Sequence, residues 1–177
     1  MSAVGGELTF LSPDRVAAGS SFHPVLRSPL ERALGPAELP GIEDISLATG
    51  KIEVRGDVDG LGADAGRLVR FASDRALVLC RYDEVARNRA QLGGRFHLVI
   101  DQTGALAGLR IARPDGKRLL RRLTELDLDA LPAVGSVAGV RTYILEDDEG
   151  AFLVFFAQEY GHYMAEVVID AVEGLVR

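Results

Sequence analysis

The chain has 177 residues, 47% of them hydrophobic and 26% charged, which is typical of a globular protein able to bury a core without metal or disulfide crosslinks. Its formal net charge of −6 argues against nucleic-acid binding and against a surface for anionic lipid, since both normally need a basic excess. The one cysteine, Cys80, has no internal disulfide partner, and the N-terminus lacks the features of a signal peptide. We therefore expect a cytoplasmic protein.

Residues 1–41 are predicted to form an extended N-terminal arm, because five prolines and five glycines interrupt them. Only one short helix fits, over residues 29–34, with Ser28 as its N-cap and Pro29 at its first position. The arm still contains apolar residues, more than a disordered tail normally has, among them Phe22, Val25, Leu26 and Leu30. We expect it to lie on its own domain or on a partner.

A regular pattern begins at residue 42 and predicts strands over 42–47, 51–55, 67–72, 76–81, 95–101 and 106–112. In the second of these, Ile52 and Val54 alternate with charged residues. Phe96, Leu98 and Ile100 are expected to share one face of the fifth. Residues 83–92 predict a helix that ends at two glycines, and the glycine-rich segment 56–66 is expected to be a loop.

The second half of the chain predicts a helix opened by Pro114, with leucines at helical spacing on one side. A loop is expected over 127–135, followed by strands near 137–146 and 152–157 that are joined by an acidic turn. The second of these strands is apolar on both faces, which predicts a central, covered position. The last helix is expected over 160–176.

This element order predicts an α+β fold of two interlocked ferredoxin-like (βαββαβ) halves with antiparallel sheets and helices on one face of each. The second half lacks its final strand, and residues 42–47 are expected to supply it from the other end of the chain. The predicted organisation is an arm, residues 1–41, and a single domain, residues 42–177.

Residues that carry catalytic chemistry are sparse. No two of His23, His97 and His162 stand at metal-ligand spacing, and Cys80 alternates with apolar residues on a predicted strand, as a small buried residue does. No Walker A loop, Rossmann fingerprint or G-x-S-x-G motif occurs, and acidic residues in segment 56–66 argue against phosphate binding. We predict no catalytic residues and no metal site.

Two clusters allow a binding role. The basic cluster comprises Arg110, Arg113, Lys117, Arg118, Arg121 and Arg122, and it predicts a basic helix face that is either simply solvated or docks an acidic partner or a polyanionic ligand tail. The aromatic cluster comprises Tyr143, Phe152, Phe155, Phe156, Tyr160 and Tyr163. We interpret it as core, with a pocket for a flat ligand as the alternative.

Four segments carry a resemblance to a known family: SPLERAL at 28–34, ISLATGKIEVRGD at 45–57, VIDQTGALAGLRIARPDGKRLLRRLTELDLDAL at 99–131, and the tail FAQEYGHYMAEVVIDAVEGL. Together they resemble the gamma subunits of heterotetrameric sarcosine oxidase over residues 25–177. The chain departs from them at Ala112-Arg113, where relatives often have glycine. The same fold pattern is that of the folate-binding domain of glycine-cleavage T-protein.

The resemblance implies a non-catalytic gamma-type subunit that acts in assembly and partner docking in sarcosine and one-carbon metabolism. Alone it would have no activity and bind no cofactor, since the larger flavoprotein subunits handle the flavins, NAD and folate. We expect no nucleic acid or membrane partner, and self-association of the isolated chain stays open. The residues nominated for docking are Phe22, Val25, Leu26, Pro29 and Leu30 in the arm, and Lys117, Arg118, Arg121 and Arg122 in the helix.

Two alternatives remain. The first is a stand-alone tetrahydrofolate-binding protein related to aminomethyltransferase, with the aromatic cluster and the basic helix as its pocket. The second is a thiol or metal enzyme that uses Cys80 and a histidine.

Overall fold

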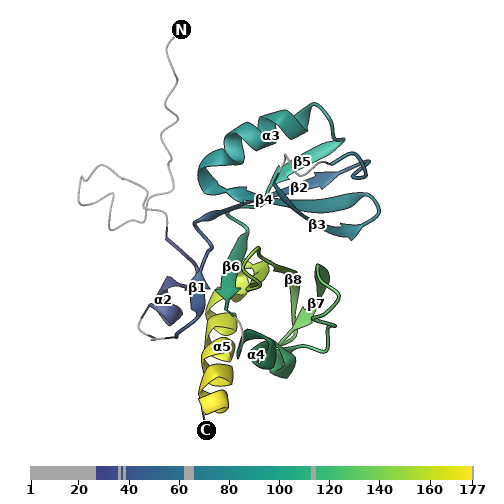
Figure 1. Ribbon diagram of the computed structural model, residues 1–177. Coiled ribbons are helices and arrows are strands. Elements are labelled where there is room, and N and C mark those ends of the chain that lie inside the picture. The colour runs from purple at the N-terminus through teal and green to yellow at the C-terminus, as the bar shows by residue number, and fades with distance from the viewer. Residues whose placement is uncertain (1–26, 36, 38, 62–65, 113–114, 177) are drawn as a thin grey trace, which may run out of the picture.

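A computed structural model describes residues 27–35, 37, 39–61, 66–112 and 115–176 (Figure 1). The described chain is α+β and contains a four-stranded and a five-stranded antiparallel sheet. The sheets pack against each other through one face, and helices cover the opposite face of each. The predicted α+β class and the presence of two antiparallel sheets are therefore confirmed.

The four-stranded sheet forms the upper half of Figure 1, in the order β3-β4-β2-β5. Its strands are β2 (Thr49–Arg55), β3 (Arg67–Ala72), β4 (Arg75–Arg81) and β5 (Leu98–Asp101). The 3-10 helix η2 (Tyr82–Glu84) and helix α3 (Val85–Gly93) connect β4 to β5. Ile52 and Val54 on β2 are fully buried beneath α3, as their alternation predicts.

The charged face of β2 is also buried, which the sequence did not indicate. Lys51 is 0% exposed and Glu53 is 9% exposed, because the five-stranded sheet covers this face. Glu53 forms an ion pair with Arg55 at 2.7 Å. Apolar and charged side chains therefore alternate along β2, but both faces of the strand are buried.

The predicted face of β5 is wrong. Leu98 is 40% exposed, whereas Val99 packs against the core beneath α3. The reason is the strand register, which places Val99 opposite Val54 and Leu98 opposite Arg55. Phe96 is buried in the same core, but it precedes the strand.

The five-stranded sheet has the order β1-β6-β9-β8-β7. Its strands are β1 (Ile42–Asp44), β6 (Leu106–Ile111), β7 (Ala133–Val137), β8 (Val140–Glu146) and β9 (Phe152–Ala157). β9 lies at its centre, as its apolar faces predict, and β1 pairs with β6 from the other end of the chain, also as predicted.

Strand β7 was not predicted, since residues 127–135 were expected to form a loop and 137–146 a single strand. The chain instead reverses at Ala138 and Gly139, whose φ angles are 49° and 83°. Positive φ at both central residues is the geometry of a two-residue hairpin turn, for which asparagine or aspartate before glycine is the usual signal. Alanine at the first position hid this turn from the sequence pattern.

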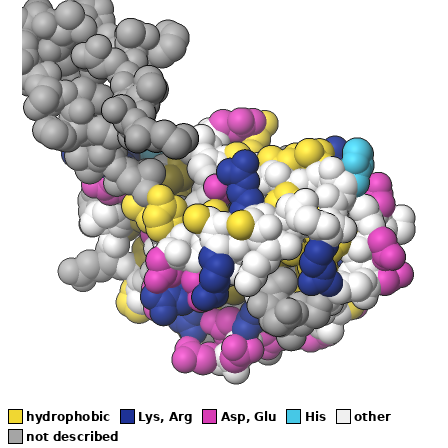
Figure 2. Space-filling view, turned by 90° about the horizontal axis from the view of Figure 1, so that it is seen from above, with side chains coloured by type: hydrophobic (Ala, Val, Ile, Leu, Met, Phe, Trp, Pro, Cys, Tyr) yellow, Lys and Arg dark blue, Asp and Glu magenta, His cyan; other side chains and the backbone are white. Residues whose placement is uncertain are grey.

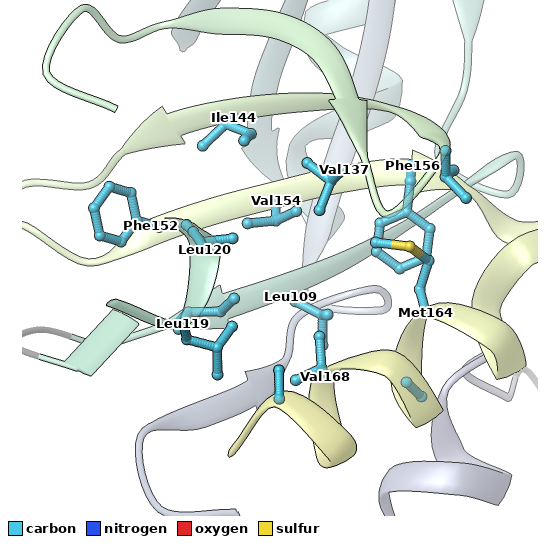
Figure 3. Close-up of a cluster of buried hydrophobic side chains, with 14 of the residues drawn as sticks. Leu109, Leu119, Leu120, Val137, Ile144, Phe152, Val154, Phe156, Met164 and Val168 are labelled. Carbon is cyan, nitrogen blue, oxygen red and sulfur yellow. The ribbon is translucent and has the colours of Figure 1, made fainter. Parts of the chain in front are cut away.

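Helices α4 (Asp115–Leu123) and α5 (Gly161–Val176) cover the outer face of the five-stranded sheet. The short helix α2 (Glu31–Leu34) packs on α5, and the 3-10 helix η3 (Gln158–Tyr160) precedes α5. Figure 3 shows side chains of these helices facing those of the sheet in the largest core cluster, among them Leu119, Leu120, Met164 and Val168 from the helices and Leu109 and Val154 from the sheet.

Candidate functional site

The described part of the arm is held by the chain's own domain. Leu30, nominated for partner docking, is 0% exposed and belongs to the core cluster beneath α5. Its backbone N–H donates to Ser28 Oγ at 3.1 Å. The helix begins at Glu31 with Leu30 as its N-cap, so the predicted N-cap at Ser28 and first helical position at Pro29 are wrong. Pro29 precedes Leu30 in the chain and is half-buried. The other arm residues nominated for docking, Phe22, Val25 and Leu26, lie outside the described residues.

The basic helix face on α4 is largely paired within the chain. Lys117 forms an ion pair with Asp129, and Arg121 lies 3.8 Å from the same carboxylate. Arg118 lies 3.6 Å from Asp115. The remaining nominated residue, Arg122, lies beside Gly174 of α5. An external anion would compete with these carboxylates for the basic side chains. The ion pairs themselves are exposed, and exposed pairs of this kind are weak.

Arg110 and the acidic turn neutralise each other within the chain. The guanidinium of Arg110 contacts Asp147 at 2.7 Å, Glu149 at 2.6 Å and Glu43 at 3.4 Å. Burial opposes ionisation of Asp147, but hydrogen bonds from Arg110 and two backbone amides outweigh it and hold the pKa of this carboxyl below its usual value. The acidic turn thus stabilises the β8–β9 connection.

The aromatic cluster does not form a flat-ligand pocket. Phe152, Phe155 and Phe156 are all 0% exposed and belong to the two cores on either side of β9. Tyr160 and Tyr163 lie on the surface, and the hydroxyl of Tyr163 donates to the carbonyl oxygen of Ala138 at 2.9 Å. The interpretation of the phenylalanines as core is correct.

Cys80 is partly buried on β4, and burial raises the pKa of its thiol, which disfavours the reactive thiolate. His97 is exposed before β5, and His162 is exposed and lies 3.2 Å from Glu166 on the same helix. His23 lies outside the described residues. Within the described ranges, no group of three or more histidine, cysteine and acidic side chains is placed to hold a metal ion.

Lys51 is the most deeply buried charged side chain among the described residues, and sequence reasoning missed it. Its Nζ donates to the carbonyl oxygens of Ser46 at 2.7 Å and Thr103 at 3.5 Å, and it lies 5.9 Å from the centre of the Phe155 ring. Burial lowers the pKa of this lysine to about 8, although Asp44 and Asp101 attract the ammonium. The side chain ties the two sheets together, since Lys51 lies in one sheet and Phe155 in the other. The only signal in the sequence was a lysine between apolar strand residues.

A cavity of about 580 Å³ opens next to this lysine, between the two halves of the chain. Its walls come from η2, α3, the β1–β2 connection, the β5–β6 turn and the segment before α2. Ser46 and Thr103, which bond the lysine, both line it. The other lining residues are Arg27, Pro29, Leu47, Tyr82, Asp83, Val85, Ala86, Arg89, Asp101, Gly104, Leu106 and Gln158. We define this space as the inter-sheet cavity.

Comparison with known proteins relates this fold to that of a solved enzyme subunit. No protein-family model matches the sequence, and no curated protein sequence does either. A chain of the heterotetrameric sarcosine oxidase from Corynebacterium sp. U-96, solved in complex with pyrrole 2-carboxylate, matches with a TM-score of 0.66 at 16% identity, over 84% of this chain and 95% of that chain. This chain shares its fold with a sarcosine oxidase subunit. That agrees with the resemblance seen in the sequence.

A second similarity is more distant. It is to a chain of the aspartokinase alpha and beta subunits, with a TM-score of 0.48 at 14% identity, over 77% of this chain and 99% of that chain.

In the described part of the sequence, the helices are all too short or too polar to cross a membrane. On the face shown in Figure 2, basic and acidic side chains are interspersed and form no broad area of one charge.

Proposed function

We propose that this chain is a non-catalytic, gamma-type subunit of a cytoplasmic oxidase complex of the sarcosine oxidase type. The observation that carries the proposal is the shared fold, which extends over 95% of a chain whose enzyme is heterotetrameric. In this proposal the larger flavoprotein chains bind the cofactors, and this chain contributes assembly and docking surface. In this proposal the chain consists of two parts, the arm, residues 1–41, and the domain, residues 42–177.

The strand orders support the finer assignment of two ferredoxin-like halves. In one half, β2 and β4 pair at the centre, flanked by β5 and β3. In the other, β6 and β9 pair at the centre, flanked by β1 and β8, with β7 added at the edge. Both arrangements place the first and third strands of a βαββαβ unit side by side. We infer that the chain repeats this unit.

The chemistry of the described side chains supports a role without catalysis. The thiol of Cys80 is held protonated by burial, and Arg110 is surrounded by three carboxylates of its own chain. Lys51, although its pKa is lowered, is enclosed between the sheets and bonded to two backbone carbonyl oxygens. Catalytic groups normally need access to a substrate, and none of these three is freely presented.

The test is purification of the tagged full-length chain from its own cells under native conditions. The expected result is co-purification, in fixed stoichiometry, of a larger chain with flavin absorbance, and sarcosine-dependent peroxide formation by the complex. The same chain produced alone is expected to be colourless and inactive. A monodisperse monomer that associates with no flavoprotein, or oxidase activity of the isolated chain, contradicts the proposal.

The tetrahydrofolate alternative makes a different prediction. Its nominated pocket relied on aromatic side chains, of which Phe152, Phe155 and Phe156 are core residues, so the ligand would need another cavity. Isothermal titration calorimetry of the isolated chain with tetrahydrofolate distinguishes the two functions. Micromolar binding would replace the subunit proposal with a stand-alone folate-binding role, and absence of binding heat rejects the alternative.

A further inference from the structure

The inter-sheet cavity lies where the described chain begins. Arg27, the first described residue, lines the cavity together with Leu47 of the β1–β2 connection and Tyr82 of η2. Figure 1 shows this beginning beside the β1–β2 connection, where the two halves of the chain meet. The part of the arm that precedes Arg27 is therefore joined to the domain at the rim of the cavity.

The residues that follow Arg27 fix this point on the domain. Pro29 packs closely on the start of α5, where a Cβ added to Gly161 would lie 2.9 Å from the Pro29 carbonyl oxygen. Leu30 is 0% exposed, and its N–H donates to Ser28 Oγ at 3.1 Å. Because the chain is anchored so close to Arg27, the residues before it can reach the cavity without any rearrangement of the domain.

Charge does not select a charged occupant for this cavity. Arg27 and Arg89 line it, and so do Asp83 and Asp101, which gives two groups of each sign. The attraction of a charged group to one pair would be offset by repulsion from the other pair. Burying a charge without a dedicated partner also costs free energy, so an uncharged occupant is favoured.

The rim of the cavity is apolar. Leu47 is 38% exposed and Tyr82 is 48% exposed, and both are among the few large hydrophobic side chains that the described chain exposes. Val85, Ala86 and Leu106 add apolar surface to the walls. Removing such surface from water is favourable, so the cavity suits an apolar side chain.

The arm supplies an uncharged, apolar segment directly before Arg27. Residues 16–26 contain no lysine, arginine, aspartate or glutamate, and they include Phe22, Val25 and Leu26. Phe22 is five residues from Arg27, a separation that an extended chain spans with about 17 Å. A tether this short holds its segment at an effective concentration in the millimolar range, well above that of a free partner. Composition and tethering therefore both favour the arm as the occupant.

We propose that Phe22, Val25 and Leu26 occupy the inter-sheet cavity of their own chain and cover Leu47 and Tyr82. The docked segment contacts elements of both halves, since the cavity lies between them. This inference goes beyond the proposed function, because it assigns these arm residues to the chain's own domain and not to the partner for which the sequence nominated them. It does not depend on the identity of any partner.

A tryptophan probe at the rim tests whether the arm covers it. The chain contains no tryptophan, so Tyr82→Trp in the full-length chain gives a single emission that reports the exposure of the rim. Adding Phe22→Ser and Leu26→Ser is expected to shift this emission to longer wavelength and to increase its quenching by acrylamide, because the apolar cover is lost. The matched control adds Phe10→Ser and Leu11→Ser, which remove the same two residue types from a more distant part of the arm. The control is expected to leave the emission unchanged.

Photocrosslinking identifies what fills the cavity. Phe22 is replaced by a photoreactive phenylalanine in the full-length chain, and isotope-labelled and unlabelled chains are mixed in equal amounts before irradiation. The expected crosslink joins position 22 to Leu47 or to residues 82–86 of the same molecule, without mixed-isotope products. The same replacement at Phe10 is the control and is expected not to crosslink to these walls. Because position 22 keeps an aromatic side chain, this experiment does not depend on whether the serine variant folds.

Several results would overturn the inference. If the serine substitutions at positions 22 and 26 leave the emission of the position-82 probe unchanged, or if the control pair shifts it equally, the arm does not specifically cover the rim. Mixed-isotope crosslinks would assign the cavity to a second copy of the chain, and crosslinks from position 22 to a partner chain would place the segment elsewhere. None of these outcomes affects the subunit role, which co-purification with a flavoprotein chain tests separately.

Discussion

The buried lysine gives the sharpest prediction about stability. Lys51→Met removes an ammonium whose pKa burial has lowered from 10.5 to about 8. One pH unit of difference between the folded and unfolded pKa corresponds to 1.36 kcal/mol, so this gap amounts to about 3 kcal/mol. Methionine fills a similar volume and has no proton to lose. The variant also lacks the hydrogen bonds to Ser46 and Thr103, and this lowers the free energy of unfolding by an amount that does not depend on pH.

The sign of the pH dependence follows from proton binding. Below pH 8 both states hold the proton on Lys51, and the cost of burying the ammonium is fully present. Between pH 8 and 10.5 the unfolded chain binds more protons than the folded chain, so the free energy of unfolding rises with pH. We expect the difference in this free energy, unchanged chain minus Lys51→Met, to rise by about 3 kcal/mol across that window.

Urea denaturation at a series of pH values measures this difference. Subtracting the variant removes the contributions of tyrosines and other groups that titrate in both proteins. Lys117→Met is the control, since it removes the other lysine of the chain from an exposed ion pair with Asp129. If the two methionine variants have the same pH profile, Lys51 is not desolvated and the inter-sheet contact is incorrectly described.

Three further substitutions test the packing and the acidic turn. Phe155→Ala empties a fully buried site between the sheets and is expected to lower the free energy of unfolding by about 3–5 kcal/mol in urea denaturation; a loss below about 1 kcal/mol contradicts this packing. Gly50→Ala places a Cβ 2.2 Å from Val85 Cγ2 and is expected to cost about 1–3 kcal/mol, measured as a lower thermal midpoint, so an unchanged midpoint refutes the close approach. Arg110→Met leaves Asp147 without its main partner and is expected to destabilise the protein by about 1–3 kcal/mol near neutral pH. Because the folded pKa of Asp147 lies below 3.8, that difference is present above pH 3.8 and lost as pH falls through the folded pKa; a constant difference in acid titrations argues against the pair.

Much of the fold is encoded in local pattern. The alternation in β2, the apolar run of β9 and the leucine spacing of α4 identify these elements, because strand and helix periods repeat over a few residues. Strand β7 escaped detection because its turn uses alanine, and not asparagine or aspartate, at a positive φ. The face of β5 was wrong because its register depends on a partner strand far away in sequence.

The candidate site depended much more on tertiary structure. Sequence reasoning nominated Pro29 and the helix arginines, and of the nominated residues that the structure describes, Pro29 alone lines the inter-sheet cavity. Leu47, Tyr82 and Arg89 were not singled out, since each is unremarkable beside its neighbours in sequence. They come together only when η2, α3 and the β1–β2 connection meet.

The sequence by itself determined the α+β class, the central position of β9, the pairing of the first strand with the second half, and a chain without a recognisable reactive motif. These features follow from composition and from short-range periodicity, because burial restricts which residue types occupy each position of a strand or helix. Tertiary structure alone decided that Lys51 is buried, that Leu30 is core, and that a cavity lies between the halves. Burial on a given face depends on which distant segment covers it, and no local pattern records that.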